Sequence, residues 1–146
     1  MVGAAPRSSS LTAQTIGIDG FTMWATMDNV YDLYRNGTRL LEQGDYHAAA
    51  VPLARARDLE PDKTSIREAL GRALFRTQRY REAAEEFEAV VEHAPTNDFA
   101  LFCWGRSLQL MGRHAEARHP LALAACLRPE RGDYRKYADQ ARARAA

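Results

Sequence analysis

A chain of 146 residues has the size of one domain, so it can bury one hydrophobic core but not two independent ones. The formal net charge of +1, with 27% charged residues, gives no overall attraction to nucleic acid or to a membrane surface. The longest apolar run, residues 121–127, is far shorter than the roughly 20 residues that span a bilayer.

No apolar stretch near the N-terminus has the length of a signal peptide, so we expect a cytoplasmic protein. Cys103 and Cys126 are too few and too far apart for a disulfide framework or a zinc site, and we expect two reduced, buried thiols.

Residues 1–27 form an N-terminal tail that precedes the regular part of the sequence. Its first half is small and polar, which indicates partial disorder, whereas residues 16–24 are too apolar for a simple linker. We expect this second half to dock on the rest of the protein, either as a cap over the first hairpin or inside a groove. The docking side chains would be Ile16, Ile18, Phe21, Met23 and Trp24.

Residues 28–129 repeat with a period of 34, and self-similarity at such a period is typical of stacked repeat proteins. Five columns of the repeat agree in all three copies: Gly37, Gly71 and Gly105; Leu40, Leu74 and Leu108; Ala49, Ala83 and Ala117; Leu53, Phe87 and Leu121; Pro61, Pro95 and Pro129. The small residues allow two helices to approach closely, the large ones pack between them, and the proline ends the second helix. The sequence therefore predicts three helical hairpins, at residues 30–61, 64–95 and 98–129.

Residues 130–146 follow the last hairpin, whose apolar side would otherwise face water. Tyr134, Tyr137, Ala138 and Ala141 have the spacing of one helix face, so we expect a capping helix with a basic, solvated outer face and tail.

The three copies read "LYRNGTRL", "REALGRAL" and "LFCWGRSL", followed by "AAVPL", "AAEEF" and "ARHPL" and then by the proline. In this pattern the sequence resembles the tetratricopeptide repeat family over residues 30–129. Arg67, Asn36 and Trp104 depart from the usual residues of the pattern. The resemblance implies an all-α fold: a right-handed superhelical solenoid of three helix-turn-helix repeats with a C-terminal capping helix. It also implies a concave surface, lined by the first helix of each hairpin, that binds a segment of a partner protein.

Helical spacing places a set of aromatic and arginine side chains on that concave surface, and such side chains are common binding hot spots. The predicted partner-binding residues are Tyr31, Tyr34, Thr38, Arg72, Phe75, Arg76, Phe99, Phe102 and Arg106, with Leu41, Glu42, Glu68 and Gln109 beside them. We expect a partner segment with apolar or aromatic anchors next to acidic groups. The alternative is that the aromatic residues only fill space between neighbouring hairpins.

The sequence has no phosphate-binding glycine loop, no H-E-x-x-H pair, no G-x-S-x-G elbow and no C-x-x-C. We therefore expect no catalytic residues, no metal and no cofactor, and interpret the protein as a scaffold or adaptor that is not an enzyme. Two alternatives stay open: an RNA-binding helical repeat, and a self-associating assembly subunit that forms homo-oligomers. Binding to nucleic acid is disfavoured because Glu42 and Glu68 interrupt the arginines, and no membrane partner is expected.

Overall fold

The computed structural model describes residues 20–146, with side chains described from Asn29 onward. These residues form seven helices and no strand. The helices are α2 (Gly20–Glu42), α3 (Tyr46–Leu59), α4 (Thr64–Arg76), α5 (Tyr80–His93), α6 (Asp98–Leu110), α7 (His114–Leu127) and α8 (Gly132–Ala145).

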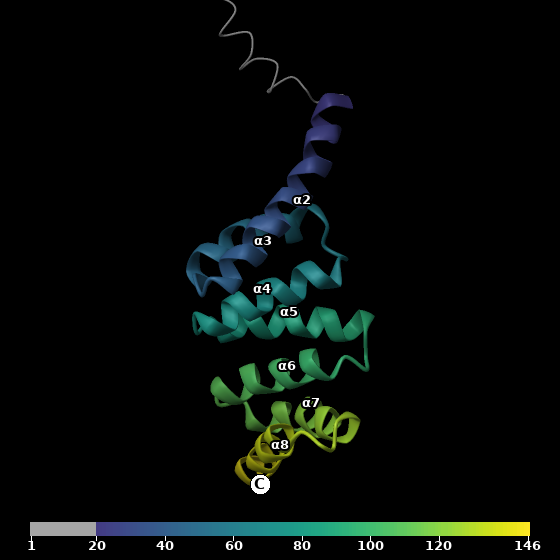
Figure 1. Cartoon of the computed structure of the whole chain (residues 1–146). Helices are drawn as coiled ribbons and strands as arrows, with labels where there is room; N and C mark the ends of the chain where they lie inside the picture. Colours follow the sequence, from purple (N-terminus) through teal and green to yellow (C-terminus); the bar gives the residue numbers. More distant parts are fainter. Residues whose placement is uncertain (1–19) are drawn as a thin grey trace, which may run out of the picture.

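The helices are stacked in the order of the chain, and each packs against the helix before it and the helix after it (Figure 1). Contacts between α2 and α4 join the first hairpin to the second, contacts between α5 and α6 join the second to the third, and contacts between α6 and α8 join the third to the last helix. This arrangement confirms the predicted all-α solenoid of three helical hairpins. No helix in the described part of the chain is long and apolar enough to cross a membrane.

The glycine column marks the place where the two helices of a hairpin approach most closely. A Cβ atom added to Gly105 would lie 2.7 Å from Leu121 Cδ2 and 3.3 Å from the Leu121 backbone nitrogen. A Cβ atom added to Gly37 would lie 2.6 Å from Leu53 Cδ2. The separations of 2.6 and 2.7 Å are shorter than real Cβ atoms show, so the glycine is required by the large residue that faces it 16 positions later.

The alanine column is fully buried between the helices of each hairpin, since Ala49, Ala83 and Ala117 have no exposed surface. The turns between the helices are also equivalent. Gly44 and Gly112 adopt positive φ angles of 81° and 80°, and the residue at the same position of the second hairpin is Gln78, with φ 65°.

Helix α8 covers the open end of the third hairpin, in agreement with the predicted capping helix. Tyr134 is completely buried, and its hydroxyl donates a hydrogen bond of 2.8 Å to a carboxylate oxygen of Asp98 in α6. Ala138 and Ala141 are buried with it. The cap thus combines apolar burial with one satisfied polar group.

Helix α2 begins at Gly20, ten residues before the predicted start of the first hairpin. No glycine or proline lies between Gly20 and Val30 to end a helix there. The predicted docking of residues 16–24 falls on residues and side chains outside those that the structure describes, so it stays a prediction.

Candidate interaction surface

A cavity of about 340 Å³ lies on the face that the first helices of the hairpins form. We call it the groove cavity. The residues that line it are Leu41 of α2, Tyr46 of α3, Arg72, Phe75 and Arg76 of α4, Phe87 of α5, and Phe99 and Cys103 of α6. Four of the nine predicted partner-binding residues, Arg72, Phe75, Arg76 and Phe99, therefore come together around one space.

Aromatic side chains hold the walls of the groove cavity in place. The guanidinium group of Arg76 lies 4.2 Å from the centre of the Tyr46 ring, a cation–π arrangement. Phe75 packs edge-on against Tyr80, and Phe99 packs edge-on against Phe87, with ring centres 5.4 Å and 6.3 Å apart. Phe99 keeps 37% of its surface exposed, so it presents apolar area to anything that enters.

The polar groups of the groove cavity are two exposed guanidinium groups, on Arg72 and Arg76. Glu68 lies near Arg72, and burial raises the pKa of its carboxyl group although the arginine counteracts this effect. Burial also raises the pKa of the Cys103 thiol to about 12, so this cysteine is a poor nucleophile at neutral pH. The cavity thus offers apolar walls and positive charge, and its thiol is unreactive.

Tyr31 and Tyr34 line a second cavity of about 350 Å³, near the start of the first hairpin. Its other walls come from Val30, from the segment that joins α3 to α4, including Lys63, and from the start of α4, including Ile66. These two tyrosines are therefore separate from the cluster around Phe99.

Thr38 lines neither cavity. Its hydroxyl donates to the carbonyl oxygen of Tyr34, 2.9 Å away, one turn earlier in α2. A side chain that bonds its own helix in this way has less capacity to bind a partner.

Phe102 and Arg106 are engaged by the capping helix. The Phe102 ring stacks on Tyr134, with 4.5 Å between ring centres, and the guanidinium group of Arg106 lies 4.0 Å from the centre of the Tyr137 ring. Arg106 also donates a 2.8 Å hydrogen bond to Gln109. Both residues lie on α6, the first helix of the third hairpin, and α8 supplies the aromatic rings that they contact.

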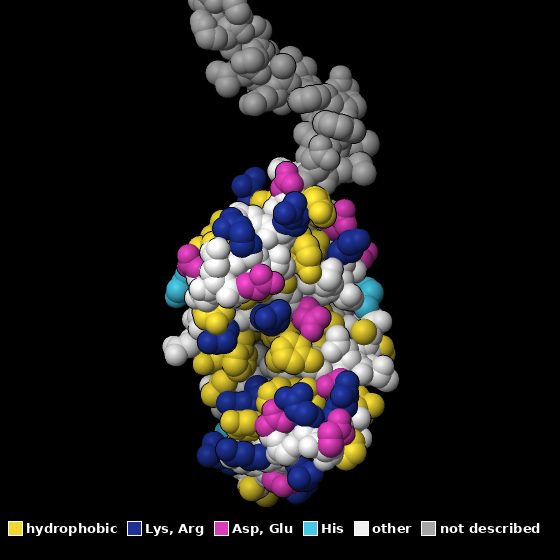
Figure 2. All heavy atoms as spheres, in the orientation of Figure 1, with side chains coloured by type: hydrophobic (Ala, Val, Ile, Leu, Met, Phe, Trp, Pro, Cys, Tyr) yellow, Lys and Arg dark blue, Asp and Glu magenta, His cyan; other side chains and the backbone are white. Residues whose placement is uncertain are grey.

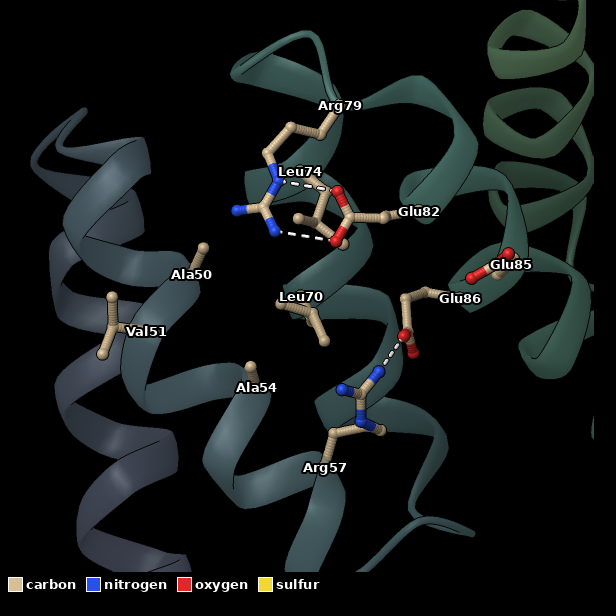
Figure 3. A pocket seen from close by; sticks show the side chains of 10 residues that line it. All are labelled: Ala50, Val51, Ala54, Arg57, Leu70, Leu74, Arg79, Glu82, Glu85 and Glu86. Carbon is tan, nitrogen blue, oxygen red and sulfur yellow. Dashed lines mark hydrogen bonds and ion pairs between the residues drawn. The ribbon is translucent and has the colours of Figure 1, made fainter.

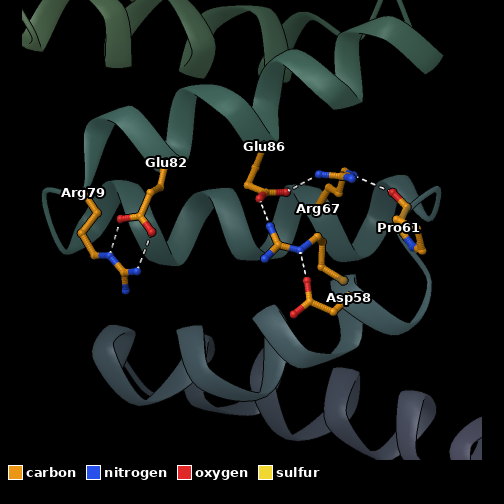
Figure 4. A network of polar contacts seen from close by, with 7 residues as sticks. Asp58, Pro61, Arg67, Arg79, Glu82 and Glu86 are labelled. Atoms are coloured by element: carbon orange, nitrogen blue, oxygen red, sulfur yellow. Dashed lines mark hydrogen bonds and ion pairs between the residues drawn. The ribbon is translucent and has the colours of Figure 1, made fainter.

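A buried ionic cluster lies away from the groove cavity, between α3, α4 and α5 (Figure 4). Glu86 is only 4% exposed and accepts hydrogen bonds from Arg57 and, at 2.8 Å, from Arg67. Arg67 also donates to the carbonyl oxygen of Pro61. Burial raises the pKa of Glu86 in spite of the two guanidinium groups. This cluster accounts for the departure of Arg67 from the repeat pattern.

Sequence reasoning missed two residues of these sites, Tyr46 and Glu86. Tyr46 and Tyr80 occupy the same repeat column, at the start of the second helix, and this repetition could have identified Tyr46 as part of an aromatic wall. Glu86 stands in the column of Pro52 and Pro120, so a charged residue at a column otherwise occupied by proline was the available signal.

The exposed surface of the stack is mixed in character. On the face shown in Figure 2, basic and hydrophobic side chains alternate along the stack and hydrophobic side chains gather near its middle, with acidic side chains scattered among them. Within the described part of the chain, no group of three or more His, Cys, Asp or Glu side chains could hold a metal ion.

Residues 34–98 match the model of the tetratricopeptide repeat family. The match covers most of the first two hairpins, which are tetratricopeptide repeats, and the third hairpin repeats their pattern. No curated protein matches the sequence. Among solved structures, MamA from AMB-1 is 25% identical, with a TM-score of 0.72 over 77% of this chain and 61% of the MamA chain. The chain thus spans less than two thirds of the length of that relative.

Two further structures with tetratricopeptide repeats share the fold and were determined with bound peptides. The first repeat domain of Spaghetti (RPAP3), bound to an HSP90 peptide, is 18% identical, with a TM-score of 0.72 over 82% of this chain and 95% of that chain. The Yersinia enterocolitica secretion chaperone SycD, in complex with a peptide of the translocator YopD, is 18% identical, with a TM-score of 0.63 over 80% of this chain and 89% of that chain.

Proposed function

We propose that this protein is a non-catalytic interaction module that binds a segment of a partner protein in the groove formed by the first helices of its repeats. The observation that carries this proposal is the groove cavity, where Arg72, Phe75, Arg76 and Phe99 converge from two repeats. Concave sites with mostly apolar walls and a few polar groups are the usual form of a binding site. RPAP3 and SycD share the fold and were determined with bound peptides, which supports a peptide segment as the ligand.

The chemistry of the groove cavity favours a partner segment with an apolar or aromatic anchor next to a carboxylate. Leu41, Phe75 and Phe99 offer the apolar contact area. Arg72 and Arg76 are exposed and can each donate paired hydrogen bonds to an acidic side chain or a C-terminus. Glu68 lies near Arg72 and would repel a phosphate backbone, which disfavours RNA in this groove.

We further propose a cytoplasmic location for the protein. Cys103 is buried, whereas Cys126 is exposed, so the prediction of burial is wrong for Cys126; neither cysteine is in a disulfide. Two free thiols fit a reducing compartment.

The proposal is tested by capture of partners from a lysate of the source organism, on immobilised wild-type protein and on the Arg72→Glu and Phe99→Ala variants. Arg81→Glu is the matched control, because Arg81 is exposed on α5 and lies outside the groove cavity. Captured proteins are identified by mass spectrometry. The binding segment of each is then mapped and synthesised, and its affinity is measured at two salt concentrations.

We expect Arg72→Glu and Phe99→Ala each to weaken binding of the mapped segment by about tenfold or more, as for other hot-spot residues, and Arg81→Glu to leave it unchanged. Equal recovery on all four proteins would overturn the proposal. Recovery that disappears after ribonuclease treatment, with affinity that falls steeply with salt, would indicate RNA binding instead.

A further inference from the structure

A third cavity, of about 400 Å³, lies between the second helices of the first two repeats and shares no lining residue with the groove cavity. We call it the convex cavity. Its floor is formed by Leu70 and Leu74 of α4, and one wall by Ala50, Val51 and Ala54 of α3 (Figure 3). Val51 is 64% exposed. The apolar wall therefore continues to the protein surface.

The convex cavity exists because of one column of the repeat. Leu70 stands where the third repeat has Trp104, 34 residues later. Trp104 packs against a cluster that contains Ala84 of α5 and Leu121 of α7, so its indole takes up the space between the helices there. The capping helix has Ala138 at this column, and a cavity opens beside it as well, between α7 and α8. A residue smaller than tryptophan at this column, leucine or alanine, thus leaves a cavity in the space that Trp104 occupies.

The opposite wall of the convex cavity is acidic. Glu82, Glu85 and Glu86 line it from α5, a helix with five glutamates and one arginine, which gives the helix a formal charge of −4. The cavity between α7 and α8 has the reverse character, because Arg118, His119 and Arg142 line it. The two cavities therefore differ in the sign of the charge that lines them, although they lie at the same position of the repeat.

The two arginines beside the convex cavity are neutralised by neighbouring carboxylates. Arg79 donates two hydrogen bonds, of 2.8 Å and 2.7 Å, to the two oxygens of Glu82. Arg57 pairs with Glu86 and with Asp58. Glu85 is exposed and makes no ion pair among the described residues. The carboxylate of Glu85, next to the apolar floor of the convex cavity, can thus pair with a ligand.

We infer that the convex cavity is a second docking site, which takes a segment of a partner protein that inserts an arginine or lysine beside an aliphatic side chain. The stem of such a basic side chain would lie on Leu70, Leu74 and Val51, and its charged end would reach Glu85. The groove cavity, with two exposed arginines, selects the opposite charge. One chain can therefore bind two segments of different character at the same time.

The test is a selection of displayed random peptides on the full-length wild-type protein, with counter-selection on the Leu70→Trp variant. This substitution places in the second repeat the residue that the third repeat already has, so it fills the cavity by a packing that the fold accepts. Glu85→Lys reverses the charge at the cavity, and Glu88→Lys is its matched control, because Glu88 is exposed on the same helix and outside the lining. Helix content is checked by circular dichroism for every variant.

We expect the selected peptides to share a basic residue next to Leu, Ile or Met. Their affinity should fall about tenfold or more on Leu70→Trp and on Glu85→Lys, the scale of a hot-spot loss, and stay within about threefold on Glu88→Lys and on Phe99→Ala. A selection without enrichment, peptides without basic residues, or peptides that bind Leu70→Trp as well as the wild type would each overturn the inference.

Peptides lost on Phe99→Ala would belong to the groove cavity and would overturn the inference of a second site. Light scattering over a concentration series tests whether the convex cavity is instead occupied by a second copy of this chain. Self-association of the wild type that Leu70→Trp abolishes would show that the site takes a second copy of this chain, which contradicts a partner of the stated kind. The groove variants Arg72→Glu and Phe99→Ala report on the proposed function alone, so the two proposals can fail separately.

Discussion

Gly105→Ala should destabilise the protein, although the same change in an ordinary helix is stabilising. Alanine is favoured over glycine in a helix interior by about 1 kcal/mol. In α6, however, the added Cβ atom would lie 2.7 Å from Leu121 Cδ2 and 3.3 Å from the Leu121 backbone nitrogen. Leu121 is completely buried, so its side chain has no free space to turn into, and α6 and α7 must move apart.

Overpacking of this kind costs about 1–3 kcal/mol, and the propensity gain of about 1 kcal/mol offsets part of it. We expect a net loss of about 1–2 kcal/mol in the free energy of unfolding, measured by urea denaturation followed by circular dichroism. Gly132→Ala is the matched control, because the nearest atom to its added Cβ would be 4.0 Å away, on Arg135. This control should be neutral or slightly stabilising.

A double-mutant cycle identifies the cause. Leu121→Ala alone should cost about 2–5 kcal/mol, and together with Gly105→Ala it should cost at least about 1 kcal/mol less than the sum of the two, because the clash is absent. If Gly105→Ala is as stable as the wild type or more stable, the close approach of α6 and α7 described above is wrong.

Two further substitutions test other features of the fold. Gln78→Gly should stabilise the protein by about 1 kcal/mol in urea denaturation, because Gln78 has a φ of 65° at the turn position where the other repeats have glycine. An unchanged midpoint of urea unfolding would show that this turn is not strained. Cys103 has a pKa raised by burial from 9.0 to about 12, so the folded state holds its proton more tightly than the unfolded state. The stability that this difference provides is fully present below pH 9 and is lost as the pH rises toward 12. In urea denaturation between pH 8 and 11, Cys103→Ala should therefore reduce the loss of stability with rising pH. If the loss is the same in the variant, it comes from other groups, such as Tyr134.

The scaffold was predictable from the sequence because its packing is periodic. Each hairpin has to bring the same two helix faces together, so the same small and large residues recur every 34 positions, as Ala49 and Ala83 illustrate with their complete burial. The glycine column and its large partner, such as Gly105 and Leu121, are two halves of one contact. A single sequence is enough to identify such pairs, since each repeat serves as a comparison for the others.

The surface was less predictable, because the contacts of long side chains depend on how neighbouring repeats are turned relative to one another. Helical spacing places Phe99 and Phe102 on the same face of α6. Phe99 lines the groove cavity, whereas Phe102 stacks on Tyr134 of the capping helix. The capping helix does not repeat the residues of the hairpins, so no internal comparison could have identified Tyr134 as the partner of Phe102.

Two of the residues at which the second repeat departs from the other two form an ion pair beside the convex cavity. Arg67 stands where they have Leu33 and Leu101, and Glu86 stands where they have proline. Replacement of a buried ion pair by apolar residues of similar size is often neutral or stabilising, and the other repeats show that this fold accepts apolar residues at both columns. A requirement for stability therefore does not account for the pair. A requirement for negative charge next to an open, apolar cavity does account for it, because Glu86 and Glu82 can hold Arg57 and Arg79 in place while Glu85 faces the solvent.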